Sequence, residues 1–190
     1  MEGFAVEKLL IIGFVLFIVL PIVFIVPFYN KFITLRNYIK EAFSTMDVYL
    51  KKRWDLIPNL VETTKGYIQH ENEVLEKITQ LRNQNYGFLN NKEKMDINNK
   101  LTLGLSNLIA TAENYPDLKA NENFNNLMNE LTSIENDIAN SRKYYNGTVR
   151  EYNTAIQLFP AVIIANIFNF EEEKLFEINS SERENVKVVF

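Results

Sequence analysis

The feature that most constrains this chain is an apolar run close to its amino terminus. Residues Leu9–Asn30 carry no charge, and Leu9–Phe28 are almost wholly apolar. Twenty residues of helix span about 30 Å, the thickness of the hydrocarbon core of a bilayer. A helix that is apolar on every face over this length is typical of a membrane span rather than of a soluble core. We therefore expect a transmembrane helix over 9–29. The residues that mark this predicted anchor are Leu9, Leu16, Val19 and Phe28.

A cleaved signal peptide is the competing interpretation of the run. The apolar region of a signal peptide is usually about 7–15 residues long and ends in a small-x-small cleavage site. The run in this chain is longer and ends in VPFY at Val26–Tyr29, without such a site. We therefore expect an uncleaved anchor, in which Pro21 and Pro27 are tolerated as they are in other membrane helices. Tyr29 is then expected at the level of the lipid headgroups.

Charge flanks the anchor unevenly, which predicts its orientation. Residues 31–53 carry six basic and two acidic side chains, a balance of +4, whereas Lys8 is accompanied by Glu2 and Glu7. The more positive flank usually faces the cytoplasm. The sequence therefore predicts a short external amino terminus and a cytoplasmic location for residues 31–190.

Downstream of the anchor, apolar side chains recur at steps of three and four in four stretches, which indicates amphipathic helices. The clearest stretch, 124–159, alternates these steps over five heptads, as coiled coils do. Ser141 and Thr148 within it favour a mixed bundle over a two-stranded zipper. Asn121 is expected to cap this helix and Pro160 to end it.

Pro58 lies between the first two apolar stretches. Proline must either kink a continuous helix or open a new one. No glycine or turn cluster surrounds Pro58, so we expect one long kinked helix that ends at the turn-rich residues 83–94.

The expected fold is therefore all-α: a single N-terminal transmembrane helix, an antiparallel bundle of about four long kinked helices, and a short C-terminal tail. The expected domains are an external amino terminus (1–8), the transmembrane helix (9–29), a cytoplasmic helical bundle (30–160), and an apolar segment with an acidic tail (161–190). Residues 185–190, NVKVVF, are compatible with a short extended segment.

Residues 159–170, FPAVIIANIFNF, are too few to span a bilayer but supply apolar surface beyond the one stripe per helix that a bundle needs. They must pack against the bundle, lie in the bilayer interface or meet another subunit. Anchoring also confines all copies to one plane and raises their effective concentration. We therefore expect a homo-oligomer. Its predicted contacts are Phe159, Ile163, Ile167 and Phe168, together with the anchor helices.

Composition excludes several classes of function. The chain has no Cys, which removes disulfides, thiolate metal sites and cysteine nucleophiles. His70-Glu71 begins like a zinc-protease motif, but position 74 is Val and the chain has no second His, so we expect a structural or surface role for His70. A net charge of −4 argues against nucleic-acid binding. The six glycines form no phosphate loop. We expect no catalytic residue, no metal and no cofactor.

Several blocks of the chain resemble the LemA family of bacterial membrane proteins. Arg53–Thr63, RWDLIPNLVET, is similar to the RRxDLIPNLVET signature of that family, and Lys65–Glu71 matches its KGYxxHE pattern. Glu113–Phe124, ENYPDLKANENF, resembles its EAYPDLKANENF block, with Asn114 where Ala is usual. Tyr145-Asn146 and Tyr152-Asn153 also lie at the family's spacing. The motif residues that this resemblance singles out, as structural or partner-binding positions, are Arg53, Asp55, Pro58, Asn59, Tyr115, Pro116, Asp117, Lys119, Phe124, Tyr145, Asn146, Tyr152 and Asn153.

The resemblance implies a single-pass protein of the bacterial inner (cytoplasmic) membrane, with the bilayer as its first partner. It implies no reaction, and the family's suggested links are to membrane organisation and envelope stress. We therefore expect a non-enzymatic scaffold or assembly protein. The alternative is a sensor or adaptor that binds a small ligand or a membrane enzyme such as a protease.

The two Tyr-Asn pairs and Asp55 suggest specific contacts. The tyrosines of the two Tyr-Asn pairs, seven residues apart, are expected to be half-buried, with Asn146 and Asn153 bonding to backbone or to another helix. A ligand cradle is the alternative. Asp55 is expected to pair with Lys119 or Arg142 across the bundle, and a binding site for a partner is the alternative.

Overall fold

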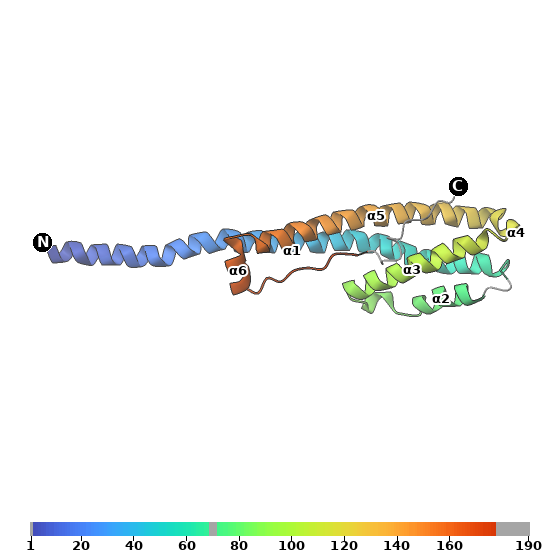
Figure 1. The fold of residues 1–190 in the computed structure, drawn as a ribbon, viewed down its shortest axis with the longest axis horizontal. Coiled ribbons are helices and arrows are strands. Elements are labelled where there is room, and N and C mark those ends of the chain that lie inside the picture. The colour runs from blue at the N-terminus through green and yellow to red at the C-terminus, as the bar shows by residue number, and fades with distance from the viewer. Residues whose placement is uncertain (1, 69–71, 178–190) are drawn as a thin grey trace, which may run out of the picture. The chain divides into compact units, whose positions relative to one another are not determined.

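The helical elements follow one another along the chain from the anchor to the tail (Figure 1). In this computed structural model, which describes residues 2–68 and 72–177, no strand is present among the described residues. The predicted all-α class is therefore confirmed. The elements are α1 (Glu2–Lys65), α2 (Asn72–Arg82), the 3-10 turn η1 (Tyr86–Phe88), α3 (Asn91–Ala112), α4 (Pro116–Lys119), α5 (Glu122–Gln157) and α6 (Ala161–Ile167).

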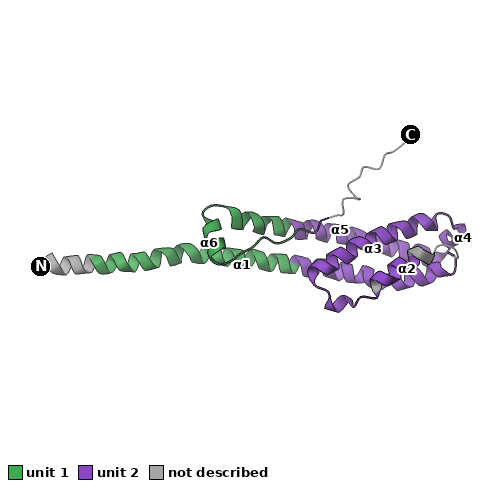
Figure 2. Ribbon diagram, turned by 60° about the horizontal axis from the view of Figure 1, so that its bottom comes forward, with its two compact units in different colours: residues 1–41, 147–175 green, residues 42–146, 176–190 purple. Residues whose placement is uncertain are grey.

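The chain divides into two compact units, coloured separately in Figure 2. Unit 1 comprises residues 1–41 and 147–175, and unit 2 comprises residues 42–146 and 176–190. Each unit therefore takes part of α1 and part of α5.

Helix α1 continues through Pro58, as predicted, but ends at Lys65. The expected extension of the same helix to residue 82 is wrong. Gly66 follows α1, and glycine is a poor helix former. The backbone N–H groups of Tyr67 and Ile68 both donate to the carbonyl of Thr64, at 3.0 Å each. This turn closes the helix, and α2 begins separately at Asn72.

The turn composition of residues 83–94 is confirmed in part, because α3 already begins at Asn91. Asn90 and Glu93 form a capping box. The backbone N–H of Glu93 donates to Asn90 Oδ1 at 3.0 Å, and the backbone N–H of Asn90 donates to Glu93 Oε2 at 2.8 Å. Two N–H groups that the helix cannot satisfy itself thus find partners.

Three contacts in unit 2 show that α1 and α5 run antiparallel. The rings of Phe43 and Tyr145 lie 5.8 Å apart, Arg53 bonds to Glu135, and the Asn121 side chain donates to the Tyr67 hydroxyl at 2.9 Å. Residue numbers rise along one helix as they fall along the other. Helices α1 and α3 instead run parallel, because Asp47 meets Lys94 and Arg53 meets Asn98. The buried apolar side chains of unit 2 include Met46, Leu50, Ile57, Leu60, Ile78, Leu101, Leu108, Leu118, Ile134 and Ile138.

Helix α5 begins as predicted. The backbone N–H of Phe124 donates to Asn121 Oδ1 at 3.0 Å, so Asn121 caps the helix. The predicted apolar stripe is buried from Phe124 to Ala155, with Leu127 and Thr148 intermediate, but its last member, Phe159, is 82% exposed. Phe159 lies beyond Gln157, the last residue of α5, and so leaves the helical phase of the stripe.

Candidate functional site

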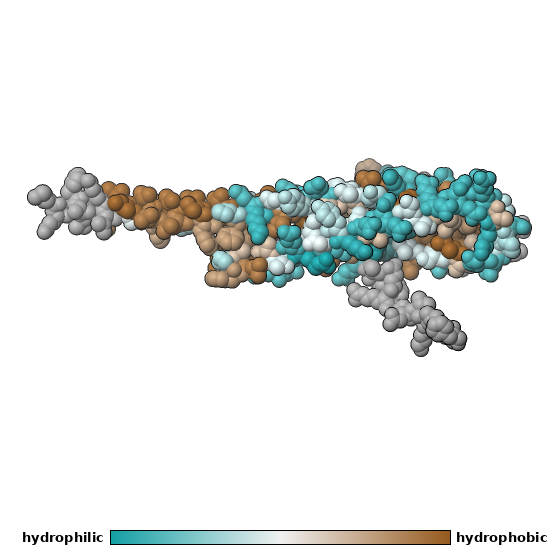
Figure 3. All heavy atoms as spheres, turned by 90° about the horizontal axis from the view of Figure 1, so that it is seen from above, coloured by the Kyte–Doolittle hydropathy of each residue, from teal (hydrophilic) through white to brown (hydrophobic). Residues whose placement is uncertain are grey.

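The described part of the chain contains one helix that is long and apolar enough to cross a membrane, and its apolar stretch is the amino-terminal part of α1. The large apolar side chains between residues 10 and 26 are exposed, including Leu16 at 50% and Val19 at 44%, except for Ile25, which is half-buried. Phe28 is half-buried, and Leu9 lies in α1. Figure 3 shows this stretch as continuous apolar surface. Such a surface is unfavourable in water, which supports a membrane anchor here.

An aromatic cluster in unit 1 joins the end of the anchor to the segment after α6. The ring of Tyr29 lies 5.1 Å from that of Phe168 and 5.6 Å from that of Phe170. The rings of Phe32 and Phe170 lie 5.1 Å apart. All three pairs are edge-on, an arrangement that aromatic rings favour.

A helix-ending turn places Phe170 in this cluster. Asn169 has a φ of 55°, in the left-handed region that asparagine tolerates better than most residues. The backbone N–H of Phe170 donates to the carbonyl of Ala165 at 2.9 Å, and that of Asn169 donates to the carbonyl of Asn166 at 3.4 Å. These two bonds form a Schellman motif, so α6 ends and the chain reverses at Asn169.

Helix α6 has one buried and one exposed face. Ala161, Ile164 and Ala165 are buried. The predicted contact residues Phe159, Ile163, Ile167 and Phe168 are all exposed, Ile167 at 62%. The structure thus shows that one side of the 159–170 segment packs within its own unit. What covers the exposed side stays a prediction.

The Tyr152-Asn153 pair holds the chain after α6 against α5. The Tyr152 hydroxyl donates to the carbonyl of Glu171 at 2.9 Å and accepts from Arg36 Nη2 at 3.2 Å. The Asn153 side chain donates to the carbonyl of Glu173 and accepts from its backbone N–H, both at 2.9 Å.

The Tyr145-Asn146 pair makes the equivalent bond in unit 2. The Asn146 side chain donates to the carbonyl of Phe176 at 3.0 Å and accepts from its N–H at 2.8 Å. The guanidinium of Arg142 lies 4.5 Å from the centre of the buried Phe176 ring. Backbone bonding by both asparagines is confirmed, although both tyrosines are fully buried rather than half-buried.

The spacing of the two asparagines fits this role. Seven residues of helix advance about 10.5 Å and three residues of extended chain about 10 Å. Asn146 and Asn153 are seven residues apart on α5, and their partners Phe176 and Glu173 are three apart. Sequence reasoning found the asparagines but could not identify the extended segment as their partner.

Arg53 lies at the centre of a buried polar cluster in unit 2 and is 0% exposed. Its guanidinium donates to Thr102 Oγ1 at 3.0 Å, to Glu135 Oε1 at 2.6 Å and to the carbonyl of Asn98 at 2.6 Å, and also to Asn98 Oδ1. Burial lowers the pKa of Arg53, although the charge of Glu135 opposes this effect. The cluster joins α1, α3 and α5 and has the character of a structural crosslink.

A second cluster surrounds Tyr86, which sequence reasoning missed. The Tyr86 hydroxyl donates to Asp47 Oδ1 at 2.5 Å, and Lys94 Nζ pairs with Asp47 Oδ2 at 2.6 Å. The Tyr86 ring also lies 5.2 Å from that of Trp54. Burial, followed by the bond to Asp47, raises the pKa of Tyr86. Tyr86 lies in the turn-rich region where no helical periodicity marks a buried position.

The predicted pairing of Asp55 across the bundle is wrong. Asp55 is exposed and pairs with Lys51, one turn earlier on α1. Lys119 pairs with Glu113 instead. Both charges find opposite charges nearby in the sequence, which cost less chain ordering to reach than a distant helix.

The remaining motif residues have structural positions. Asn59 is exposed and Pro58 is half-buried within α1. Tyr115 is the N-cap residue of α4, Pro116 occupies its first turn, and Asp117 is exposed there. Phe124 is buried at the start of α5.

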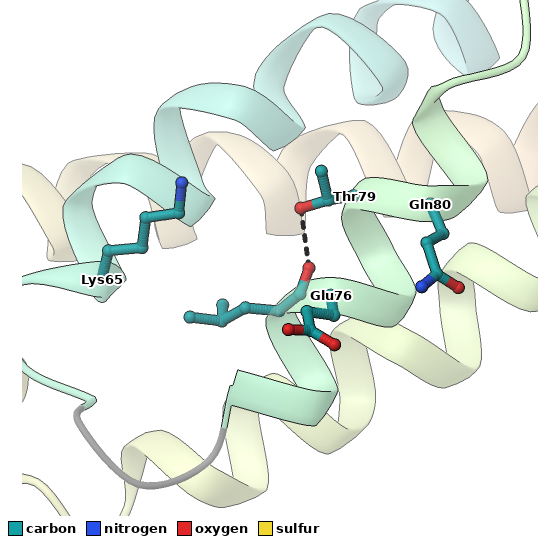
Figure 4. A pocket seen from close by; sticks show the side chains of 5 residues that line it. Lys65, Glu76, Thr79 and Gln80 are labelled. Atoms are coloured by element: carbon teal, nitrogen blue, oxygen red, sulfur yellow. Dashed lines mark hydrogen bonds between the residues drawn. The ribbon is translucent and has the colours of Figure 1, made fainter.

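An open pocket of about 290 Å³ in unit 2 is lined by Lys65, Leu75, Glu76, Thr79 and Gln80 (Figure 4). The Thr79 hydroxyl already donates to the carbonyl of Leu75 at 2.7 Å, and Lys65 lies 3.9 Å from Glu62. Among the residues described, no group of three or more His, Asp or Glu side chains could hold a metal ion. His70, with its predicted structural or surface role, and the predicted extended segment at 185–190 lie outside the described residues.

Comparison with known proteins adds relatives at low identity. The chain is 25% identical over 158 residues to Protein LemA of Metamycoplasma hominis, covering 83% of this chain and 72% of that protein. It is 23% identical over 174 residues to the magnetosome protein MamQ of Magnetospirillum gryphiswaldense and 25% identical over 175 residues to MamQ 2 of Paramagnetospirillum magneticum. Each match covers 78% of this chain and 64% of the MamQ protein, slightly under two thirds of its length. A family model for the LemA family matches residues 42–190. Because this match includes more than half of the chain, the protein belongs to the LemA family.

Proposed function

We propose that this protein is a membrane-anchored, non-enzymatic scaffold, whose helical domain organises other components at the bacterial inner membrane. The observation that carries the proposal is that one helix, α1, contains both the exposed apolar anchor and residues of the core of unit 2. The continuous helix supports the proposal because it tethers the domain covalently to the membrane anchor.

The polar side chains of the motifs support a structural role. Hydrogen bonds to other parts of the same chain are formed by four of them, Arg53, Asn146, Tyr152 and Asn153. A catalytic group must instead reach a reacting atom of a substrate. The internal bonds of these four residues support roles in packing and positioning, as a scaffold requires.

The test compares three forms of the full-length protein in native membranes. The first is the wild type, the second has residues 9–29 replaced by an unrelated single-pass apolar helix, and the third carries Leu16→Arg and Val19→Arg. Neighbouring proteins are fixed by a crosslinker and quantified by mass spectrometry, with the unrelated helix alone as control. We expect the anchor-swapped form to keep the wild-type neighbours and the third form to lose them. A wild type whose neighbours match those of the helix alone would refute the scaffold proposal.

Two further features of the proposal are testable with one protein preparation each. Self-association predicts a defined oligomer in detergent at all concentrations, whereas an adaptor would stay small until its partner is added.

The cytoplasmic orientation predicts that a cysteine at Tyr144 resists an impermeant thiol reagent in intact cells, while a cysteine at Gly3 reacts. The chain has no native Cys, so the labelling is clean.

A further inference from the structure

Helix α6 carries an exposed apolar surface that its own unit does not cover. This surface, called here the α6 face, consists of Leu158, Phe159, Ile163, Ile167 and Phe168. The opposite side of the helix is buried through Ala161, Ile164 and Ala165, so the orientation of α6 within unit 1 is set by packing. Five large apolar side chains thus point away from the unit at a defined place. We propose that the α6 face is a second membrane contact, inserted into the interfacial layer of the bilayer beside the end of the anchor.

The contact with Tyr29 sets the depth of this face. Tyr29 directly follows the apolar run, so an anchor that crosses the bilayer places Tyr29 at the headgroup level. The ring of Phe168, a member of the α6 face, lies 5.1 Å from that of Tyr29. The α6 face therefore begins at the boundary between headgroups and acyl chains. At this depth, apolar side chains of a short helix are expected to meet lipid.

The apolar surface is continuous from the anchor to α6 within unit 1 (Figure 3). A surface that continues the membrane-facing surface of the anchor favours lipid as its occupant over a separate protein. Asn166 and Asn169 are exposed near its edge, which is the mixed polar and apolar character of helices that lie in an interface.

The acidic residues that follow α6 are bonded to α5 within unit 1. Glu171 and Glu173 are bonded through their backbone to Tyr152 and Asn153, which lie on α5 before its end. The Gln157 side chain also donates to Glu172 at 2.7 Å. The backbone of Glu171 and Glu173 is thus held against α5, while the carboxylate of Glu172 is bonded to Gln157, the residue that precedes Leu158 of the α6 face.

The experiment uses single-cysteine variants of the full-length protein labelled with an environment-sensitive fluorophore. Ile163→Cys and Ile167→Cys report on the α6 face, Leu16→Cys reports on the anchor, and Tyr144→Cys is the aqueous control because Tyr144 is 55% exposed on α5. Each variant is placed in nanodiscs that hold one chain, with nitroxide-labelled lipids whose label lies either near the headgroup or near the acyl-chain end. We expect the label at position 163 or 167 to be quenched about twofold more by the shallow nitroxide than by the deep one, because interfacial helices insert only about 5–10 Å. The label at position 16 should prefer the deep nitroxide, and the label at position 144 should respond to neither.

The proposal rests on the anchor crossing the bilayer, and the variants separate the two ideas. If the label at position 16 is not quenched, the anchor itself is absent from the bilayer and the proposed function fails with it. If position 16 is quenched while positions 163 and 167 behave like position 144, the anchor stands and the second membrane contact is refuted. The fluorophores at positions 163 and 167 could instead report an apolar environment only in nanodiscs that hold several chains. This result would also refute the second membrane contact, and it would assign the α6 face to a second copy of the chain.

Discussion

The buried cluster around Arg53 makes a prediction about the order of three stabilities. Arg53 is 0% exposed, whereas the side chain of its partner Glu135 is 36% exposed. Removing Glu135 leaves a charged guanidinium buried with only neutral partners. Removing Arg53 leaves Glu135 free to bind water. The loss of the partially exposed acid should therefore cost more than the loss of the buried base.

The magnitudes follow from the contacts. Breaking a buried ion pair from one side costs about 3–5 kcal/mol, and the exposure of Glu135 reduces this to about 2–4 kcal/mol for Glu135→Ala. In Arg53→Met, the carbonyl of Asn98 keeps the Thr102 hydroxyl as a donor at 3.2 Å, but Asn98 Oδ1 loses its partner in a side chain that is 3% exposed. One unsatisfied buried acceptor costs about 1–3 kcal/mol. The double variant should cost less than the sum of the two, because it leaves no buried charge.

Urea unfolding of the full-length protein in detergent, followed by far-ultraviolet circular dichroism, measures the three free energies. Asp55→Ala is the matched control on the same helix, since its exposed pair with Lys51 contributes less than about 1 kcal/mol. Additive single variants, or an Arg53→Met that costs more than Glu135→Ala, would refute the reasoning. Hydrogen bonding, and not the buried charge, would then dominate the cluster.

Three further predictions address other parts of the chain. Leu16→Arg with Val19→Arg should make the free energy of membrane insertion less favourable by about 5–7 kcal/mol, at about 2.5–3.5 kcal/mol per charge, so that a carbonate wash releases the protein. A protein that stays in the membrane would show that the α6 segment is sufficient to retain it. The raised pKa of Tyr86 means that the unfolded phenol ionises first, so stability falls as pH rises above about 10, and Tyr86→Phe should lessen this fall; an unchanged pH profile contradicts it. Asn153→Ala should cost about 1–3 kcal/mol and speed amide exchange at Glu173, with Asn166→Ala as the exposed control; slow exchange would contradict the bond.

Local patterns were enough to predict much of the fold. The unbroken apolar run of the anchor and the regular stripe of α5 are set by residues within a few turns of one another, so the sequence alone identifies both. Asn121 as a helix cap is local in the same sense. The extension of α1 past Gly66 failed because the apolar spacing continues across the turn, and spacing alone does not detect a helix end.

The sites depend on residues far apart in the chain, which sequence reasoning could not join. Arg53 meets partners 45 to 82 residues away, and Tyr86 meets Asp47 across 39 residues. The family motif identified Arg53 as a position of interest but did not predict that its side chain is buried. Asp55, flagged beside it, lies on the exposed side of α1, because neighbouring positions on a helix do not share a face.

The exposed face of α6 is held in place from both ends by bonds within unit 1. Before it, α6 starts within four residues of the end of α5, and the backbone N–H of Val162 donates to the carbonyl of Leu158 at 2.8 Å. After it, the left-handed Asn169 reverses the chain, the rings of Tyr29 and Phe32 contact Phe170, and Tyr152 bonds the carbonyl of Glu171. A segment that was exposed merely through loose packing would not need a helix-ending turn, an aromatic cluster and a buried tyrosine to fix it. Specific contacts therefore fix the exposed apolar side chains of α6 next to the anchor, where they can contact a bilayer.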